Sequence, residues 1–179
     1  MRCFICIDMP KEVQNELAKI QDEMPKDSKL IFVKPEDIHL TIKFLGEIDE
    51  EKAEKVKDLL RKLNFSKFKA KIGPTGVFPT QSFIRVIWAG LEPKEDFSKI
   101  HEVVDKLLLL ENFPADKEWT NHATLCRVKF IQDKRIFTET LQNIKFKPIE
   151  FTVDNLKLKK STLTPEGPVY EEMMNLKFN

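Results

Sequence analysis

The segments that decide the fold are Ile38-His39-Leu40-Thr41-Ile42-Lys43-Phe44-Leu45-Gly46 and Asn121-His122-Ala123-Thr124-Leu125-Cys126-Arg127. Each holds a histidine, one spacer and a threonine within a run of strand-forming residues. The chain has only 3 histidines, so two in the same setting indicate a shared purpose. Side chains at i and i+2 of a strand project from one face, so each segment presents an imidazole beside a hydroxyl. Two imidazoles can act as acid and base near neutral pH, and hydroxyls can bond phosphate oxygens. The pair therefore predicts a site that cleaves phosphodiesters without a metal ion.

Alternation in the first segment predicts a strand with one buried and one open face. We expect the apolar residues on the core side: Ile38, Leu40, Ile42 and Phe44. The polar residues fall on the opposite face: His39, Thr41 and Lys43. Lys43 would then add positive potential near His39, or be an ordinary solvated residue at a strand edge.

The second segment follows the same alternation less simply. Cys126 shares its parity with His122 and Thr124, so a straight strand would let its thiol face the site. Arg127 has the opposite parity and would need a bulge or a twist to reach that face. The motifs His39-Leu40-Thr41 and His122-Ala123-Thr124 themselves contain no further ligand type, whereas metal-binding histidines normally have several partners. The sequence therefore predicts no metal site here.

Hydrophobic periodicity predicts strands and helices in mixed order. The expected strands lie near residues 2–8, 30–33, 38–46, 68–72, 83–89, 119–130, 151–163 and 168–178. The expected helices begin near Pro10 and Asp49, span residues 97–108, and lie within residues 133–144. We expect residues 1–179 to form one α+β domain with two pseudo-symmetric lobes, each an antiparallel sheet backed by helices.

Composition limits the class of protein. With 41% hydrophobic and 33% charged residues, the chain has the composition of an ordinary soluble globular protein. A net charge of +1 argues against a broad nucleic-acid binder but leaves room for a local basic cleft. No run approaches the roughly 18 apolar residues of a membrane helix, and no signal-peptide pattern is present. The 3 cysteines are an odd count that suits a reducing cytosol, so we expect a cytoplasmic protein. Cys3 and Cys6 are expected to be buried structural thiols.

The paired motifs resemble the His-x-Thr signatures of the two-histidine (2H) phosphoesterase superfamily. Their surroundings are similar to the RNA 2′,3′-cyclic phosphodiesterases, also called 2′-5′ RNA ligases. The resemblance spans the chain through Arg2-Cys3-Phe4-Ile5, His39 to Gly46, Arg85-Val86-Ile87-Trp88-Ala89-Gly90, Ser161-Thr162-Leu163 and Gly167-Pro168-Val169-Tyr170. Asn121 departs from it, because the family usually has proline before the second histidine.

The resemblance implies a bilobal fold in which the two motif strands face each other across a central cleft, with helices on the outer faces of the sheets. It assigns His39 as proton donor and His122 as proton acceptor, whereas the residues alone leave these roles open. It also implies phosphate contacts from Thr41, Thr124 and Arg127. Ser161 and Tyr170 would line a nucleoside pocket, or else form a hydrogen-bonded pair in a hairpin.

The activity that the resemblance implies is hydrolysis of a terminal RNA 2′,3′-cyclic phosphate to a 2′-phosphate, with reverse 2′-5′ ligation as a further possibility. The partner would then be an RNA end, and tRNA halves are among the candidates. No cofactor, no membrane and no obligate protein partner are expected. Small cyclic nucleotides or an ADP-ribose cyclic phosphate are alternative substrates. A module that only captures RNA ends is another interpretation, but binding alone does not require two titrating groups.

Other notable residues receive simpler interpretations. The lysines near the C-terminus predict a solvated strand face that could also steer RNA phosphates: Lys157, Lys159 and Lys160. Trp88 and Trp119 are expected in the core, although either could border a base-stacking surface. His101 lacks a following threonine and is expected to be structural.

Overall fold

The computed structural model describes all residues from 1 to 179. Its strands are β1 (Arg2–Asp8), β2 (Lys29–Phe32), β3 (His39–Glu47), β4 (Phe68–Thr80), β5 (Phe83–Glu92), β6 (Ala123–Phe130), β7 (Glu150–Val153), β8 (Asn155–Thr164) and β9 (Gly167–Lys177). Its helices are α1 (Lys11–Asp22), α2 (Glu50–Leu60), α3 (Lys94–Leu108) and α4 (Lys134–Asn143), with short 3₁₀ turns η1 (Pro35–Asp37) and η2 (Leu109–Glu111). The predicted α+β class is confirmed.

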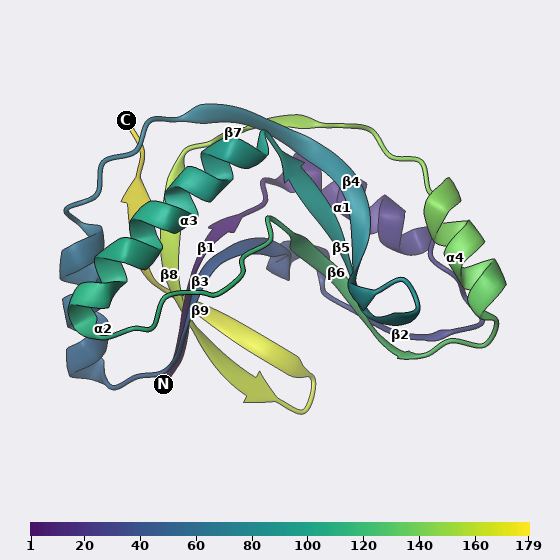
Figure 1. Cartoon of the computed structure of the whole chain (residues 1–179), viewed down its shortest axis with the longest axis horizontal. Coiled ribbons are helices and arrows are strands. Elements are labelled where there is room, and N and C mark those ends of the chain that lie inside the picture. Colours follow the sequence, from purple (N-terminus) through teal and green to yellow (C-terminus); the bar gives the residue numbers. More distant parts are fainter.

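The strands form one antiparallel sheet rather than the two that the sequence predicts. Its order is β7-β4-β5-β6-β3-β1-β8-β9, and β2 pairs with the outer part of β6. The two halves meet at β3 and β6, where Leu40 pairs with Ala123 and no other residues of these strands pair. The halves therefore stay distinct, yet they are joined directly between the two motif strands (Figure 1).

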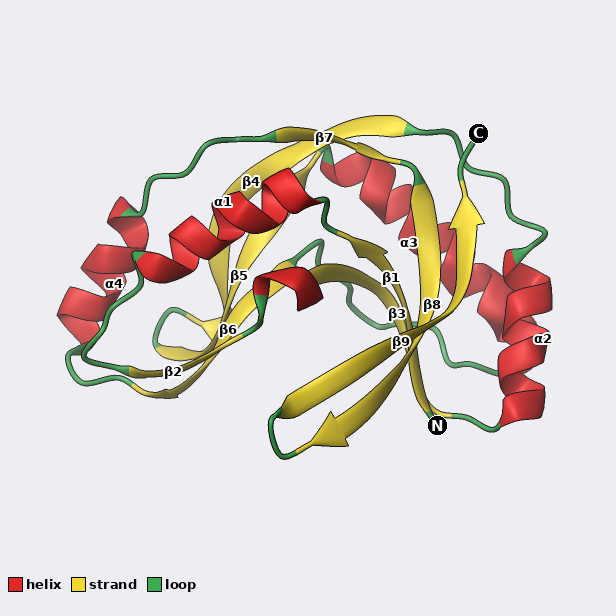
Figure 2. Cartoon of the chain, turned by 180° about the vertical axis from the view of Figure 1, so that it is seen from behind, coloured by secondary structure: helices red, strands yellow, loops and turns green.

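The helices cover the sheet on both halves (Figures 1 and 2). α2 and α3 lie together on one half, and α1 and α4 lie on the other. Their apolar stripes are buried, with Val13, Leu17 and Ile20 of α1 and Phe97 and Val104 of α3 fully enclosed. Burial of each large apolar side chain contributes about 1.5–3 kcal/mol, so these stripes fix the helices to the sheet. No helix is both long and apolar enough to cross a membrane.

The helix starts follow local capping chemistry. The carboxylate of Asp49 accepts a hydrogen bond from the backbone N–H of Lys52 at 2.8 Å, which caps α2. Asp133 caps α4 in the same way through the N–H of Ile136 at 3.0 Å. Such caps each stabilise a helix by about 1 kcal/mol. The helix expected to begin at Asp49 is confirmed.

Several strand boundaries differ from the prediction. The second motif strand, expected over 119–130, begins only at Ala123, so His122 lies immediately before it. β4 continues past Gly73 and Pro74, because a register shift between Ile72 and Thr75 absorbs them without ending the pairing with β5. The segment expected as one strand at 151–163 is divided at Asp154. β7 pairs with β4 and β8 pairs with β1, so the chain passes from one half of the sheet to the other at this point.

The β8–β9 hairpin projects beyond the body of the molecule (Figure 2). Leu163 and Val169 near its tip are 69% and 56% exposed. Ser161 pairs with Tyr170 between the two strands, at the level where the hairpin leaves the sheet. The hairpin thus forms one wall beside the face of β3 that carries His39.

Candidate active site

A β-bulge interrupts the motif strand β3. Thr41 pairs with Cys6 and Lys43 pairs with Ile5, so Ile42 has no partner on β1. A bulge adds one residue to one strand and reverses the alternation beyond it. Ile42 and Lys43 are consequently both buried, and Phe44 emerges on the face of His39 with 65% exposure. The predicted core position of Phe44 is therefore wrong.

The second motif strand, β6, contains a bulge at the matching place. Thr124 pairs with Trp88 and Cys126 pairs with Ile87, which leaves Leu125 unpaired. Beyond this bulge, Arg127 lines the same cleft as His122. The bulge that Arg127 was expected to need in order to reach this face is therefore present. Cys126 is turned into the core, where its thiol contacts the Met24 sulfur at 3.6 Å. Cys126 therefore does not face the site, which straight alternation would have allowed. Burial also raises the pKa of its thiol to about 12, so the thiol is protonated.

One cleft of about 370 Å³ runs along this face of the sheet. It is lined by seven of the residues singled out in the sequence: His39, Thr41, His122, Thr124, Arg127, Ser161 and Tyr170. The Leu40–Ala123 pair explains how the two motifs come together. Both residues are fully buried on the far face of the sheet, so their flanking side chains project into the cleft. Around this single pair, the residues that flank Leu40 and Ala123 in the two motifs all line the cleft.

Both imidazoles are held through the same ring nitrogen. His39 Nδ1 lies 2.7 Å from the carbonyl oxygen of Asp37, and His122 Nδ1 lies 2.8 Å from that of Thr120. A carbonyl oxygen can only accept, so Nδ1 must carry the proton in each ring. Nε2 is then left to take up a proton when the ring is neutral, or to donate one when the ring is charged.

Aromatic rings fix the orientation of each histidine. Phe4 stacks on His39 with ring centroids 4.9 Å apart, and Tyr170 meets the same imidazole edge-on at 5.3 Å. Phe78 contacts His122 edge-on at 4.9 Å, and Trp88 lies 6.1 Å away. Trp88 therefore packs beside the site rather than deep in the core.

Burial sets the acidity of both groups. Loss of water around His39 lowers its pKa, and the hydrogen bond to Asp37 partly opposes this effect. The charges of Lys159 and His122 lower the pKa of His39 further, and the charge of Asp8 raises it. Burial also lowers the pKa of His122, opposed by its bond to Thr120. Each ring is therefore neutral at lower pH than a free histidine, whose pKa is about 6.5.

Lys43 does not line the cleft, which corrects the prediction that it adds charge beside His39. Beyond the bulge, its ammonium group points away from that face and is 2% exposed. It donates to Asp105 Oδ1 at 2.5 Å, Asp116 Oδ1 at 2.8 Å and the carbonyl oxygen of Pro114 at 2.7 Å. Lys43 is thus a structural cation that ties β3 to α3 and to the loop before His122.

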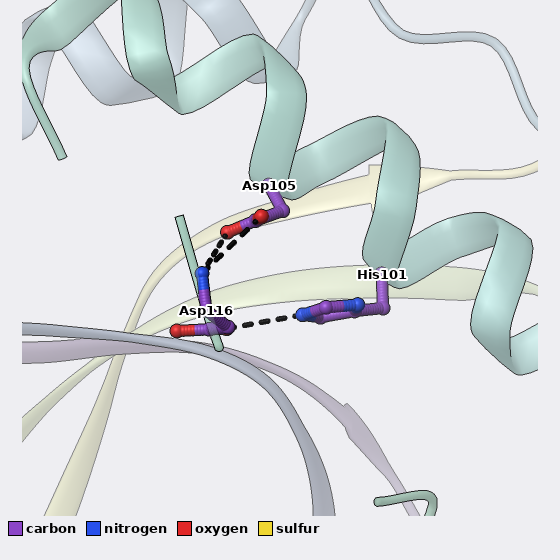
Figure 3. A group of neighbouring side chains, drawn as sticks. All are labelled: His101, Asp105 and Asp116. Atoms are coloured by element: carbon purple, nitrogen blue, oxygen red, sulfur yellow. Dashed lines mark hydrogen bonds and ion pairs between the residues drawn. The ribbon is translucent and has the colours of Figure 1, made fainter. Parts of the chain in front are cut away.

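The same cluster contains His101 (Figure 3). His101 Nε2 lies 3.0 Å from Asp116 Oδ2, and its ring stacks on Trp119 at 4.6 Å. Trp119 in turn donates its indole N–H to the carbonyl oxygen of Thr41 at 3.1 Å. His101, Asp105 and Asp116 have the atom spacing of a metal site, but the Lys43 ammonium already supplies the cation between the two carboxylates.

Two of the three C-terminal lysines, Lys157 and Lys159, do not lie on a solvated face, whereas the side chain of Lys160 is 37% exposed and pairs with the exposed Glu171. Lys159 Nζ lies 2.6 Å from Asp8 Oδ1, and Lys157 Nζ lies 3.1 Å from Asp8 Oδ2. Their side chains are only 12% and 19% exposed. Asp8 pairs directly with His39 between β1 and β3, so this ionic group lies beside the first motif rather than in open solvent.

Asn121 has a structural explanation. It is 8% exposed, and its side-chain amide donates to the carbonyl oxygen of Leu91 at 2.6 Å. This bond anchors the chain immediately before His122 to β5. Asn121 thereby restrains the approach to the second motif by a hydrogen bond instead of by a proline ring.

Several cleft residues were not singled out as site residues in the sequence: Arg2, Phe4, Phe32, Lys34, Asp37 and Phe44. Arg2 and Phe4 lie in a segment that carried the family resemblance, but no motif marked them as cleft residues. The Asp37 contact is made by its backbone, which sequence pattern cannot reveal. Phe44 was hidden because strict alternation places it in the core.

This site and fold define a two-histidine phosphoesterase. The chain belongs to the family of LigT like phosphoesterases, because the model of this family matches residues 7–88 and 91–170. The resemblance drawn from the sequence is therefore confirmed.

Individual relatives cover nearly the whole chain. An RNA 2′,3′-cyclic phosphodiesterase of Methanocaldococcus jannaschii is 38% identical over 174 residues, covering 96% of this chain and 97% of the relative. Another, of Thermotoga maritima, is 34% identical over 181 residues, covering 99% and 96%. The crystal structure of TT0787 of Thermus thermophilus has a TM-score of 0.85 at 28% identity, covering 99% of this chain and 98% of that one. E. coli LigT complexed with 3′-AMP has a TM-score of 0.82 at 19% identity, covering 99% and 97%, and shares the fold.

The Lys43 cluster yields a test of its structural role. Lys43→Met keeps the volume but leaves Asp105 and Asp116 without their cation, so we expect a loss of about 3 kcal/mol in the free energy of unfolding. Urea unfolding at pH 7 measures it. Lys55→Met, which removes an exposed pair with Glu51, is the control and should change stability little. A stable Lys43→Met protein with weakened substrate binding would instead place Lys43 in the cleft.

Proposed function

We propose that this protein hydrolyses the 2′,3′-cyclic phosphate at the end of an RNA to a 2′-phosphate. The observation that carries the proposal is the pair of imidazoles in one cleft, each tied through Nδ1 to a backbone carbonyl with Nε2 left for proton transfer. The relatives named RNA 2′,3′-cyclic phosphodiesterase support the choice of substrate.

The reaction needs one proton removed and one delivered. In the proposed mechanism, Nε2 of neutral His122 takes a proton from water as its oxygen attacks phosphorus. Nε2 of protonated His39 gives a proton to the departing 3′-oxygen as the P–O3′ bond breaks. Attacking and leaving oxygens lie roughly in line at phosphorus, so the two histidines must act from opposite sides of the phosphate.

The remaining motif residues would hold the phosphate. The hydroxyls of Thr41 and Thr124 can donate to its non-bridging oxygens, and the guanidinium fork of Arg127 matches two of them. Arg127 forms no ion pair with an acidic residue, so its charge is available to the substrate. An RNA 5′-hydroxyl in place of water would run the same chemistry towards a 2′-5′ linkage.

The mechanism requires no metal or other cofactor, because its proton transfers and charge stabilisation are supplied by side chains. The grouping with metal-ligand spacing, His101 with Asp105 and Asp116, lies outside the cleft. RNA ends, tRNA halves among them, are the proposed partners, without an obligate protein partner. The three buried free thiols fit the proposed cytoplasmic location.

We also propose that residues 1–179 form one domain whose two lobes are pseudo-symmetric. In each motif strand the bulge falls at the third residue after the histidine, at Ile42 and Leu125. In each, the fourth residue turns into the core and the fifth lines the cleft. Each histidine also bonds the carbonyl two residues before it. This matching extends well beyond the His-x-Thr letters.

Substitution of the two histidines tests the proposal. His39→Ala and His122→Ala should each lower kcat on a cyclic-phosphate oligonucleotide by roughly 10²–10⁴-fold. The double variant should lose less than the product of the two losses, because the pair acts as one unit. His101→Ala is the matched control and should keep its activity once folded. Near-normal turnover by either motif variant would remove that histidine from the mechanism.

The pH dependence follows from the lowered pKa values. Activity should fall as pH drops through the pKa of His122, because the base becomes protonated. It should also fall as pH rises through the pKa of His39, because the acid loses its proton. Burial lowers both, so the bell-shaped profile of kcat/KM should have its optimum below about pH 6.5. The alkaline limb of kcat should lie higher, since bound phosphate favours the charged His39. An optimum of kcat/KM near pH 9 would contradict these assignments.

A further inference from the structure

The lysines on the hairpin side of the cleft are neutralised. Lys157 and Lys159 of β8 pair with Asp8, and Lys160 pairs with Glu171 at 3.5 Å. Glu166, at the turn between β8 and β9, lines the cleft without an ion-pair partner. The hairpin therefore offers little positive charge to an RNA chain, although the sequence suggested its lysines for that role.

The opposite side of the cleft, formed by β2, β5 and β6, carries free cations (Figure 1). Residues 29–34, 75–91 and 121–132 contain no aspartate or glutamate. The cations of these segments are Lys29, Lys34, Arg85, Arg127 and Lys129. None of them forms an ion pair. Because the whole chain has a net charge of only +1, this positive charge is a local feature.

The cations of β2 and β6 lie on the cleft face of the sheet. Arg127 and Lys129 flank the buried Val128, so both project from this face about 7 Å apart. On β2, Ile31 pairs with Arg127 and lines the cleft. Lys29 shares the face of Ile31 two residues away and is exposed. Lys29 and Lys129 therefore extend the positive charge of Arg127 outward from the cleft.

Arg85 extends it in the same direction on β5, because the adjacent Val86 pairs with Arg127. Ile84 is buried, so Phe83 before it projects from the cleft face, with 57% exposure. The guanidinium of Arg85 lies over the ring of Phe83, 4.9 Å from its centroid. This favourable cation–π contact holds the charge of Arg85 on the cleft face.

We propose that Lys29, Arg85 and Lys129 form a basic strip that binds the backbone of the RNA on the 5′ side of its cyclic-phosphate end. Such phosphate contacts position a nucleic acid without reading its sequence. The inference rests on the proposed function and deepens it, since it gives the path of the RNA chain out of the cleft. The chain runs over the outer ends of β2, β5 and β6 and not along the β8–β9 hairpin.

Substrates of two lengths separate the basic strip from the active site. The dinucleotide ApA with a 2′,3′-cyclic phosphate has a single phosphodiester, whereas dodeca-adenylate with the same end has enough to cover the strip. Wild-type kcat/KM should be roughly ten-fold higher on the dodecamer in about 50 mM salt. Raising the salt should remove this advantage with a log–log slope of about −2, as expected for three phosphate contacts of a single strand.

Removal of the strip should act on the long substrate alone. The triple variant Lys29→Gln, Arg85→Gln, Lys129→Gln should lose most of the advantage of the dodecamer through a higher KM, with kcat unchanged. It should keep kcat/KM on ApA within about two-fold of wild type. Arg85→Gln alone should reduce the salt slope by about 0.7. Thermal unfolding shows that each variant is folded.

A matched control removes the same charge elsewhere. The triple variant Lys62→Gln, Lys67→Gln, Lys106→Gln changes exposed lysines that form no ion pair and lie outside the cleft. It should keep the advantage and the salt slope of the dodecamer.

The outcomes distinguish the strip from the proposed function. Equal kcat/KM of the wild type on the two substrates would overturn the strip while the phosphodiesterase stands. Equal losses in the strip variant and its control would do the same, because net charge and not position would then govern binding. Failure of the wild type to open either substrate would overturn the proposed function, and the strip with it.

Discussion

The arrangement depends on a single antiparallel pair, Leu40 with Ala123, that joins the two halves of the sheet. These residues are the spacers of the two His-x-Thr motifs, and both are fully buried. Burying the spacers on one face forces the flanking imidazoles and hydroxyls onto the other. A one-residue slip would turn every motif side chain into the core. The hydrophobic cost of exposing Leu40 therefore keeps the acid–base pair in the cleft.

The bulges then decide what accompanies the histidines. Without the extra residue at Leu125, Arg127 would point away from the cleft and the Cys126 thiol would take its place. Without the one at Ile42, the Lys43 ammonium would enter the cleft and Phe44 would fill the core. The fold thereby places a cation from one lobe and an aromatic ring from the other in the cleft. The distinction arises from backbone geometry as much as from the choice of residues.

The sequence predicts the motif faces up to the bulges and fails beyond them. Periodicity reveals which side of a strand is apolar, so His39, Thr41, His122 and Thr124 were placed together correctly. It cannot show an unpaired residue, because Ile42 and Leu125 are as apolar as their neighbours. Alternation predicts Arg127 on the face of His122 only if a bulge is present, and its prediction that Lys43 shares the face of His39 is wrong. The joining of two expected sheets into one was also hidden, since it rests on one pair of residues far apart in sequence.

A buried ionic cluster supports the site from behind. Lys43, Asp105 and Asp116 tie β3 to α3 and to the loop that leads to His122, and Trp119 bonds the backbone of Thr41. Such a cluster repays its desolvation only when its geometry is well satisfied. Its three hydrogen bonds to the Lys43 ammonium meet that condition. The charge that the sequence seemed to offer to the substrate instead helps to hold the two motifs at a fixed separation.

The most direct test of two-imidazole catalysis is phosphorus NMR of the product formed from a cyclic-phosphate oligonucleotide in excess EDTA. We expect undiminished conversion to a 2′-phosphate, because in the proposed mechanism His39 protonates the 3′-oxygen and no divalent ion takes part. Conversion that stops in EDTA and returns with added metal ion would contradict the mechanism. A predominantly 3′-phosphate product would show that the proton donor faces the 2′-oxygen.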